Sequence, residues 1–357
     1  MMPLLIFWSV WCATALVASA VLTWQLIGWA MGRGVIDVPN ARSSHTRATP
    51  RGGGLAIVGV VTVAAALAVI LHPESIVPIA GVLLPSLAIA SVSWLDDVRP
   101  LKNRTRLSIH VLAAVAATAT LGPVCQVNLG SFGTFDLGIA AWPLTLLWII
   151  GLTNAFNFMD GIDGIAGITA TVSGLAIAVA AGFFGATAVA AVAAAFAAAS
   201  LGFLSCNWQP ARIFMGDVGS AFCGFLLAVL PMAVPLKSEP AVASVCVVAL
   251  WPFIFDTAST LLYRLWKREN IFRAHRSHLY QRLTIAGWSH RGVASLYGGI
   301  SAMSGMVAIA PLFDPLARAA ADRALLAVMV ICMALLVALV LVAERREGIP
   351  AGEVPHA

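Results

Sequence analysis

Residues 154–164 read NAFNFMDGIDG and follow an uncharged, apolar run from Trp142 to Thr153. Within this segment amides and carboxylates recur at every third position, at Asn154, Asn157, Asp160 and Asp163. A helix has 3.6 residues per turn, so steps of three drift by about 60° each and cannot keep four side chains on one helical face. We therefore predict a helix that ends near Asn157 and then a turn to which Gly161 and Gly164 give backbone freedom. Carboxylates and amides would converge there, as oxygen ligands of a hard cation such as Mg²⁺ do.

The composition indicates a membrane protein. Of the 357 residues, 60% are hydrophobic and only 10% are charged, whereas soluble domains have about 25% charged residues. The six cysteines are scattered without a CxxC spacing, so neither a zinc site nor a disulfide framework is expected. We predict an all-α polytopic protein with a single transmembrane domain over residues 1–343 and a short polar cytoplasmic tail over 344–357.

Apolar runs of about 20 residues are long enough to cross a bilayer. They predict about eleven membrane helices, and ten are also possible because several borders between runs are not sharp. The runs lie near residues 4–30, 53–71, 76–95, 107–122, 140–157, 165–183, 185–205, 219–236, 241–263, 293–312 and 324–343. The pair between 164 and 205 is so rich in alanine that its dividing turn is placed at Gly182–Gly185 from the glycines alone. The first run is read as a retained membrane helix, because it lacks the basic start of a secretory signal.

The basic residues predict an orientation. Of the 21 Lys and Arg residues, 18 fall in alternate loops and the tail, over 31–52, 96–106, 206–218, 264–292 and 344–357. The opposite loops hold only Lys237, Arg318 and Arg323. The positive-inside rule then puts the N-terminus outside and the C-terminus in the cytoplasm. The chemistry-bearing residues fall in the basic loops, so we expect the active site on the cytoplasmic face.

Two acidic motifs lie on that face. Asp96 and Asp97 end the third run, and their adjacent charges raise the pKa of one member unless a cation shares them; a solvated helix end balanced by basic neighbours is the alternative. Asp217 lies between Gly216 and Gly219 in FMGDVGS, where a cation or a phosphate could approach the backbone. An aspartate that simply caps the next helix is equally compatible with this position.

Two basic motifs accompany them. AHRSHLYQRL contains His275, Arg276 and His278, which suit phosphate and nucleotide contacts; a basic loop against anionic lipid is the alternative. Arg51 stands in TPRGGG, which is either a seat of backbone N–H groups for an anion or a flexible helix entry. Asp256 lies inside an apolar run and is expected to be functional or paired, for instance by orienting a His or Arg of the next loop. Together these groups indicate metal-assisted phosphoryl transfer.

The motifs SWLDDVRPL, NAFNFMDGIDG, FMGDVGS and AHRSHLYQRL resemble, in this order, the cytoplasmic-loop motifs of the polyprenyl-phosphate N-acetylhexosamine-1-phosphate transferases. The resemblance implies a Mg²⁺-dependent enzyme, with Mn²⁺ as a substitute ion, in which undecaprenyl phosphate attacks the β-phosphate of a UDP-N-acetylsugar. The products are the polyprenyl-diphosphate-sugar and UMP. It implies Asp217 and Asn157 as metal residues and Asp96 as the base, with a direct nucleophilic role of the Asp96-Asp97 pair as the alternative. Asp160 and Asp163 are implied as further catalytic residues that contact the nucleotide or the metal site. Substrate contacts are expected from Asn154, Arg51, His275, Arg276 and His278.

The resemblance also narrows the biological setting. HRSH replaces the run of three histidines that is usual in phospho-MurNAc-pentapeptide transferases, so the enzymes that start O-antigen or common-antigen synthesis resemble the chain more. We expect a multi-pass protein of the bacterial inner membrane that contacts lipid, with UDP-GlcNAc or a 6-deoxy-N-acetylhexosamine relative as donor. No nucleic acid partner is expected, and both a monomer and a homodimer are compatible with the sequence. Two other classes compete, a cation-coupled transporter that uses the carboxylates as an ion path and a non-catalytic membrane scaffold.

Overall fold

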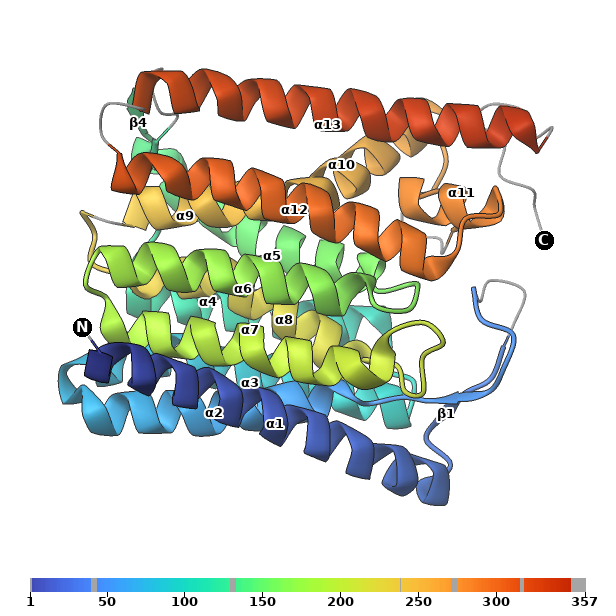
Figure 1. The fold of residues 1–357 in the computed structure, drawn as a ribbon, viewed down its shortest axis with the longest axis horizontal. Coiled ribbons are helices and arrows are strands. Elements are labelled where there is room, and N and C mark those ends of the chain that lie inside the picture. The colour runs from blue at the N-terminus through green and yellow to red at the C-terminus, as the bar shows by residue number, and fades with distance from the viewer. Residues whose placement is uncertain are drawn as a thin grey trace.

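The computed structural model of the chain describes residues 2–39, 44–128, 133–237, 239–270, 275–314 and 318–347. Most of its helices lie side by side with their long axes nearly parallel (Figure 1). In chain order the long helices are α1 (Met2–Arg33), α2 (Gly54–Leu71), α3 (Ile76–Val98), α4 (Asn103–Leu121), α5 (Ala141–Met159), α6 (Ile165–Phe183), α7 (Thr187–Asn207), α8 (Asp217–Val229), α9 (Glu239–Ala249), α10 (Trp251–Trp266), α12 (His290–Phe313) and α13 (Arg318–Arg346).

The short elements lie in the connections. They are the short helix α11 (Leu279–Ile285), the 3₁₀ turns η1 (Pro73–Ser75), η3 (Gly138–Ala140) and η4 (Leu230–Ala233), and the strands β1 (Ile36–Asp37), β2 (Thr49–Pro50), β3 (Gln126–Asn128) and β4 (Thr134–Asp136). The strands form two antiparallel pairs, β1 with β2 and β3 with β4. Figure 1 shows β1 and α11 at the end of the bundle opposite to β4.

Each of the eleven predicted apolar runs falls on helical structure, although the run at 241–263 is divided between α9 and α10. Eight helices in the described residues are long and apolar enough to cross a membrane, and a ninth span results if α9 and α10 are joined. The runs at 107–122 and 219–236 correspond to α4 and to α8 with η4. These two are not among the helices that are long and apolar enough to cross a membrane. The protein is therefore an all-α polytopic membrane protein, while the count of eleven and the orientation stay predictions.

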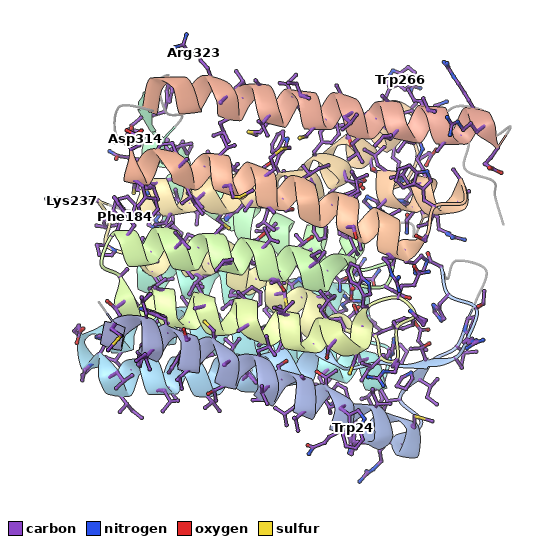
Figure 2. The ribbon with its side chains drawn as sticks, viewed as in Figure 1. Trp24, Phe184, Lys237, Trp266, Asp314 and Arg323 are labelled. Carbon is purple, nitrogen blue, oxygen red and sulfur yellow. The ribbon has the colours of Figure 1, made fainter. Side chains whose placement is uncertain are left out.

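The two ends of the bundle differ in the way that the charge pattern predicts. Helix α1 begins at one end of the bundle, and α13 ends at the other (Figure 1). Lys237, Asp314 and Arg323 lie at the end that holds the N-terminus, whereas Trp24 and Trp266 lie toward the other end (Figure 2). Lys237 and Arg323, from loops predicted to lie outside, thus share one end of the bundle, and the pocket residues of the acidic and basic motifs lie at the other.

Small residues allow the close packing of the central helices. The turn predicted at Gly182–Gly185 is confirmed, because α6 ends at Phe183 and α7 begins at Thr187. A Cβ atom on Gly174 of α6 would lie 2.7 Å from the Phe196 ring of α7, and one on Gly202 of α7 would lie 2.3 Å from the Leu16 carbonyl of α1. Such positions suit helix association in lipid, which depends on close backbone approach.

Helix α8 lies in the middle of this bundle and carries the site at its first residue. All of its residues from Val218 to Val229 are buried. A Cβ atom on Gly224 would lie 2.7 Å from the Cβ of Phe156 in α5, so α5 and α8 are in backbone contact there. Because α8 is enclosed on all sides, its N-terminus is a fixed point for the polar groups around it.

The C-terminal part of the chain is arranged less regularly. Helices α9 and α10 meet at a bend of 68°, and α10 diverges from the bundle toward α13 (Figure 1). The polar tail predicted from residue 344 begins inside α13, which continues to Arg346. Glu344 is buried. Its two carboxylate oxygens accept bonds from Arg282 of α11, at 2.7 and 2.8 Å, so the buried charge is paired. Residues 348–357 of that tail lie outside the described residues.

Candidate active site

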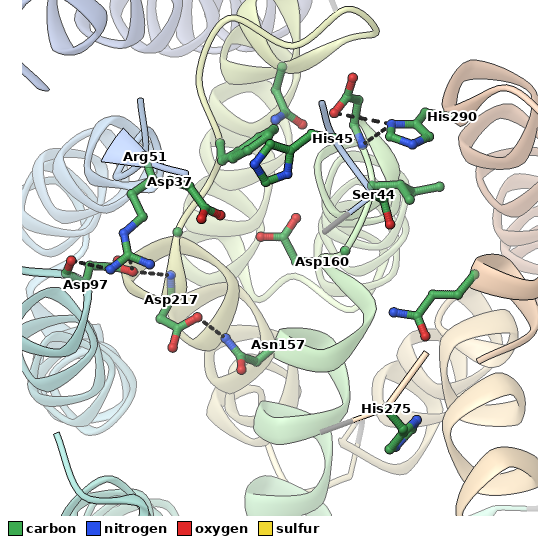
Figure 3. Close-up of a pocket in the computed structure, with 17 residues that line it drawn as sticks. Asp37, Ser44, His45, Arg51, Asp97, Asn157, Asp160, Asp217, His275 and His290 are labelled. Carbon is green, nitrogen blue, oxygen red and sulfur yellow. Dashed lines mark hydrogen bonds and ion pairs between the residues drawn. The ribbon is translucent and has the colours of Figure 1, made fainter. Parts of the chain in front are cut away.

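A pocket of about 360 Å³ opens at the end of the bundle that holds the sequence motifs (Figure 3). Its wall combines the loop before α2 with residues from the ends of α3, α5, α7, α8 and α12. The residues that line it are Asp37, Ser44, His45, Arg51, Asp97, Asn157, Asp160, Gly161, Ile162, Asp163, Asn207, Phe214, Gly216, Asp217, His275, Gln281 and His290. Seven of the eleven predicted site residues are among them. Asn154, Asp96, Arg276 and His278 are not.

Asp97 holds the beginning of α8. Its two carboxylate oxygens accept hydrogen bonds from the backbone N–H groups of Asp217, at 3.1 Å, and Val218, at 3.0 Å. A helix N-terminus leaves such N–H groups without partners inside the helix, and Asp97 supplies the acceptors from α3. The alternative in which Asp217 itself caps α8 is therefore wrong, because Gly216 is the capping residue and a carboxylate from another helix takes the cap's role.

The Asp217 side chain is placed by an amide and a guanidinium. Asn157 of α5 donates from Nδ2 to Asp217 Oδ1 at 3.0 Å and to Ser220 Oγ at 2.8 Å. Arg106 of α4 contacts Asp217 Oδ2 at 2.9 Å and also Asp96 Oδ2 at 2.7 Å. Asp217 and Asn157, the two residues expected to hold the metal, are thus in direct contact in the structure.

Asp96 and Asp97 are adjacent in sequence but face different partners. Asp96 is bonded to Arg106 and accepts from the backbone N–H of Leu101 at 2.6 Å. Asp97 faces the pocket beside Arg51, whose Nε lies 3.7 Å from Asp97 Oδ1 and whose Nη2 donates to the Asp97 carbonyl. The two carboxylates therefore do not share one partner among the described residues, and that a cation shares them stays a prediction.

The turn after α5 differs in detail from the expectation. Helix α5 ends at Met159 rather than near Asn157. Gly164 uses the predicted backbone freedom, with a left-handed φ of +82°, but Gly161 does not have a positive φ. Gly161 is needed for a different reason, because a Cβ atom there would lie 2.1 Å from the Tyr280 hydroxyl. The second glycine of the motif therefore bends the chain, and the first lets α11 approach it.

The four polar side chains of this turn do not all converge. Asn154 donates from Nδ2 to the Ile150 carbonyl of its own helix at 2.7 Å, so its amide is engaged away from the pocket. Asp163 accepts from the backbone N–H of Ala211 at 3.1 Å, and its Oδ1 lies 3.4 Å from Nδ1 of His290. Asp163 thus connects the turn to the segment before α8 and to the first residue of α12.

Asp160 is the carboxylate of the turn that points into the pocket (Figure 3). Its side chain accepts no hydrogen bond from the part of the chain that the structure describes. Burial raises the pKa of Asp160 well above its ordinary value, and the negative charges of Asp217, Asp97 and Asp163 raise it further. The pocket therefore concentrates negative charge around a carboxylate that lacks a compensating donor, which is the arrangement that a bound cation would relieve.

TPRGGG serves to pack the loop before α2 against the loop before α8. The N–H groups of Gly53 and Gly54 donate to the Phe214 and Met215 carbonyls, both at 2.9 Å. A Cβ atom on Gly54 would lie 2.2 Å from the Cα of Gly219. Two of the three glycine N–H groups proposed as an anion seat are thus already bonded. The glycines let two backbones touch so that Arg51 reaches the pocket.

The basic loop is divided between the pocket and the interior. His275 lines the pocket, and burial followed by the charges of His278 and Arg264 lowers its pKa to about 4, so it is neutral at physiological pH. His278 is buried, and its Nδ1 lies 3.2 Å from Asp256 Oδ1, as expected if Asp256 orients a histidine of this loop. Arg276 does not line the pocket, and its buried Nε has no hydrogen-bond partner among the described residues.

Several pocket residues had no sequence signal strong enough to select them. His45 packs its ring 4.8 Å from the Phe214 ring, and its buried Nε2 has no bond to the described part of the chain. Asn207 donates from Nδ2 to the Ile213 carbonyl and accepts from Gly164 N–H. His290 is the first residue of α12. Each of these reaches the pocket through tertiary packing, which a search for clustered polar residues does not detect.

The residues on the Asp217 side of the pocket fit a magnesium ion. The described residues contain no group of three or more His, Cys, Asp or Glu side chains arranged around one point. Mg²⁺ does not need such a cage, since it is usually held by one or two carboxylates together with substrate phosphates and water. Asp217 supplies a carboxylate, and the Asn157 carbonyl oxygen remains available because its nitrogen makes both of the side chain's bonds.

Comparisons with known proteins agree with the motifs. The family model described as glycosyl transferase family 4 matches residues 79–234. A probable undecaprenyl-phosphate N-acetylglucosaminyl 1-phosphate transferase of Bacillus subtilis is 34% identical over 77% of this chain and 77% of its own length. A decaprenyl-phosphate N-acetylglucosaminephosphotransferase of Mycolicibacterium smegmatis is 28% identical over 83% of this chain and 81% of its own length. A phospho-N-acetylmuramoyl-pentapeptide-transferase of Staphylococcus saprophyticus is 27% identical over 73% of this chain and 84% of its own length.

The matched region contains three of the four motifs, from the Asp96-Asp97 pair through FMGDVGS, and the similarity to the Bacillus protein extends over most of both chains. The chain belongs to glycosyl transferase family 4, the polyprenyl-phosphate N-acetylhexosamine-1-phosphate transferases.

Proposed function

We propose that the protein transfers an N-acetylated sugar-1-phosphate from a UDP-sugar to undecaprenyl phosphate and so starts a cell-envelope polysaccharide. The donor is UDP-GlcNAc or a 6-deoxy-N-acetylhexosamine relative, and the products are undecaprenyl-diphosphate-sugar and UMP. The observation that supports this most is the pocket, which joins Asp217, Asn157 and Asp160 to Arg51 and His275 at one end of a membrane bundle. The names of the two N-acetylglucosamine-phosphate transferases among its relatives support the same reaction.

The reaction requires an acceptor phosphate to approach a sugar diphosphate, so negative charge must be neutralised. An oxygen of the acceptor phosphate forms a bond to the β-phosphorus of the donor. The bond from that phosphorus to the oxygen that bridges to the α-phosphate breaks, and UMP leaves with this oxygen and its electron pair. Magnesium held by Asp217 and Asn157 would neutralise charge on the diphosphate, and the Arg51 guanidinium is positioned at the same wall of the pocket.

We assign the acceptance of a proton from the acceptor phosphate to Asp160 in place of Asp96. Asp160 lines the pocket and has no donor in the described residues, and its raised pKa brings it toward the range that a general base needs. Asp96 is held by Arg106 and by the Leu101 N–H, outside the pocket wall. Its role in this proposal is to position Arg106 beside Asp217.

One assay tests the proposal. The purified protein is incubated in detergent with undecaprenyl phosphate, Mg²⁺ and each of UDP-GlcNAc, UDP-GalNAc and a UDP-6-deoxy-N-acetylhexosamine, and UMP release is measured. We expect release that requires both the lipid and Mg²⁺, with one donor preferred. Absence of UMP with every donor in a correctly folded preparation would refute the proposed reaction.

A second donor is tested in the same panel. The similarity to a phospho-N-acetylmuramoyl-pentapeptide-transferase supports UDP-MurNAc-pentapeptide as the alternative. Turnover of this donor above that of the simple sugars would place the protein in peptidoglycan synthesis. The alternatives of a cation-coupled transporter and of a non-catalytic scaffold are not supported, because the chain belongs to a transferase family. The bacterial inner membrane is the location that this function requires.

A further inference from the structure

Asp256 is a fully buried carboxylate in α10 that the proposed reaction does not use. It is 0% exposed, and five donors surround it. Oδ1 accepts from the Leu279 N–H at 2.8 Å and lies 3.2 Å from both Thr260 Oγ1 and His278 Nδ1. Oδ2 accepts from the Tyr297 hydroxyl at 2.6 Å and from the Tyr280 N–H at 3.0 Å. A buried charge is tolerated when it is bonded in this way.

Three of these bonds fix the start of α11. The N–H groups of Leu279 and Tyr280 belong to the first turn of that helix, where no intrahelical acceptor exists, and His278 is its capping residue. The other two donors, Thr260 and Tyr297, come from α10 and α12. Asp256 therefore ties α11 to the junction of two longer helices, although α11 itself has only seven residues.

The held segment reaches the pocket at two points. Gln281 of α11 and His275, three residues before the capping residue His278, both line it. The rings of His275 and His278 have centroids 5.0 Å apart, so the position of one constrains the other. A shift of α11 would thus move both pocket residues together.

The same segment also reaches the acidic turn. The Tyr280 hydroxyl donates to the Phe158 carbonyl in the last turn of α5, at 3.0 Å. Gly161, which follows Asp160, packs against this hydroxyl so closely that a Cβ atom would not fit. The position of Asp160 therefore depends on Tyr280, which in turn is held at its backbone by Asp256.

We propose that Asp256 is a positioning residue of the transferase: it holds α11 so that His275 and Gln281 face the donor substrate and so that Tyr280 supports the turn that carries Asp160. The kinetic part of this inference rests on the proposed function, whereas the structural part does not. Because a displacement of about 1 Å at a reacting group can reduce a rate about a hundredfold, a buried residue without substrate contact can control both donor binding and turnover.

The test uses the full-length protein in detergent with two measurements. Asp256→Asn keeps the volume of the side chain but replaces one acceptor oxygen by an amide that opposes the N–H donors. We expect faster hydrogen exchange in peptides covering residues 275–285, an increase of about tenfold in KM for the UDP-sugar, and a decrease of about tenfold in kcat. KM for undecaprenyl phosphate should change less than twofold. If the substitution only reduced the fraction of folded protein, the folded molecules would keep the KM of the wild type, so an increase in KM indicates a change in the site.

Two further variants separate the steps. Tyr280→Phe removes only the bond to Phe158, so exchange should rise in residues 157–164 but not at the start of α11, and kcat should fall about fivefold. Thr260→Val is the matched control, because it removes a donor from the same carboxylate without touching α11, and it should change neither KM nor kcat by more than twofold. If Asp256→Asn does not fold, Tyr297→Phe replaces it, with a smaller increase in exchange and KM.

The outcomes are distinct. Normal exchange over 275–285 in Asp256→Asn, or faster exchange with unchanged KM and kcat, would overturn the inference. Equal kinetic effects of Asp256→Asn and Thr260→Val would also overturn it, since the carboxylate would then matter only to its own helix. If the wild type releases no UMP from any donor, the proposed function fails, and the exchange data alone decide whether Asp256 holds α11.

Discussion

The two sides of the pocket are built in different ways. On one side, α3, α5 and α8 meet through bonds between their own functional groups, so that Asp97 caps α8 and Asn157 bonds to Asp217. On the other side, the segment from His275 to Gln281 comes from a loop and a seven-residue helix, and Asp256 holds it from the interior. On the first side, the candidate catalytic residues also make the bonds that hold the helices together. On the second side, the residue that holds the segment, Asp256, is different from the residues that line the pocket.

This difference indicates how substitutions should behave. A change on the α8 side removes a functional group and a structural bond together. A change on the α11 side can alter the support or the contact group alone. Effects should therefore be largest where the two roles coincide and smaller where they are separate, and the following substitutions test that order.

The largest effect is expected for Asp217→Asn, which removes a carboxylate proposed to hold Mg²⁺. Loss of charge stabilisation by one preorganised group costs about a hundred- to a thousandfold in kcat, and a metal residue should be at the upper limit. UMP release at saturating donor and Mg²⁺ measures the effect. Size-exclusion chromatography in detergent shows whether the protein remains folded, and Asn157→Asp, which retains an oxygen ligand, serves as the comparison. Turnover within tenfold of the wild type in a folded Asp217→Asn preparation would contradict the metal assignment.

A decrease of about a hundredfold in kcat is expected for Asp160→Asn, with little change in KM, because a base acts in the transition state. Asp96→Asn should cost less than tenfold, since Asp96 contacts Arg106 and not the pocket. The pKa of Asp160 is raised by burial and by the charges of Asp217, Asp97 and Asp163. A base must be deprotonated, so the rate should fall as the pH drops through this raised pKa, well above the ordinary range of a carboxyl group.

The pH profile of kcat then identifies the base. The acidic limb should be absent in Asp160→Asn and retained in Asp96→Asn. It should also move to lower pH as Mg²⁺ is increased, because the charge of the cation offsets that of Asp217. A larger loss of kcat in Asp96→Asn, with the acidic limb intact in Asp160→Asn, would restore the base role that the family resemblance assigns to Asp96.

The architecture could be predicted from the sequence because lipid imposes a simple rule. A run of about 20 apolar residues has few alternatives to a membrane helix, so each predicted run falls on helical structure. The errors in the predicted fold concern where a helix ends or bends, which hydropathy does not determine. Helix α5 continues to Met159, beyond the end predicted near Asn157. The prediction was wrong because the drift of a three-residue repeat does not show where the backbone leaves the helix. The bend between α9 and α10 leaves no mark in hydropathy, since both arms are apolar.

The sequence predicted which residues belong to the site better than it predicted which contacts they make. Spacing singled out Asp217, Asn157 and Asp160, which lie in one pocket. It could not show that Asn154 would bond to its own helix, or that Asp96 would contact Arg106 while Asp97 caps α8, because spacing along the chain does not give the partner of a side chain. His45 and His290 reach the pocket from distant segments, and only the packing of the chain brings them there.

A smaller effect than at Asp217 or Asp160 is expected on the α11 side, from Arg276→Lys. The buried Nε of Arg276 has no hydrogen-bond partner in the described residues, although the side chain does not line the pocket. If this guanidinium binds the donor diphosphate, it does so only when the substrate draws the loop inward, and its planar fork makes two parallel bonds that a lysine cannot reproduce. Loss of such a charged hydrogen bond costs about 1.5–3 kcal/mol, and we expect the lower limit, about tenfold in kcat/KM for the UDP-sugar.

Arg268→Lys is the matched control for this substitution. Arg268 belongs to the same basic loop and is exposed just after α10, so the exchange keeps the charge and should change kcat/KM less than twofold. Both variants retain the loop charge that membrane insertion and lipid attraction require, and both are compared at equal levels in the membrane. Equal effects would mean that Arg276 is only part of a basic surface. A loss above a hundredfold for Arg276→Lys would remove the difference between the two sides of the pocket, because the α11 side would then contain a group as important as those around α8.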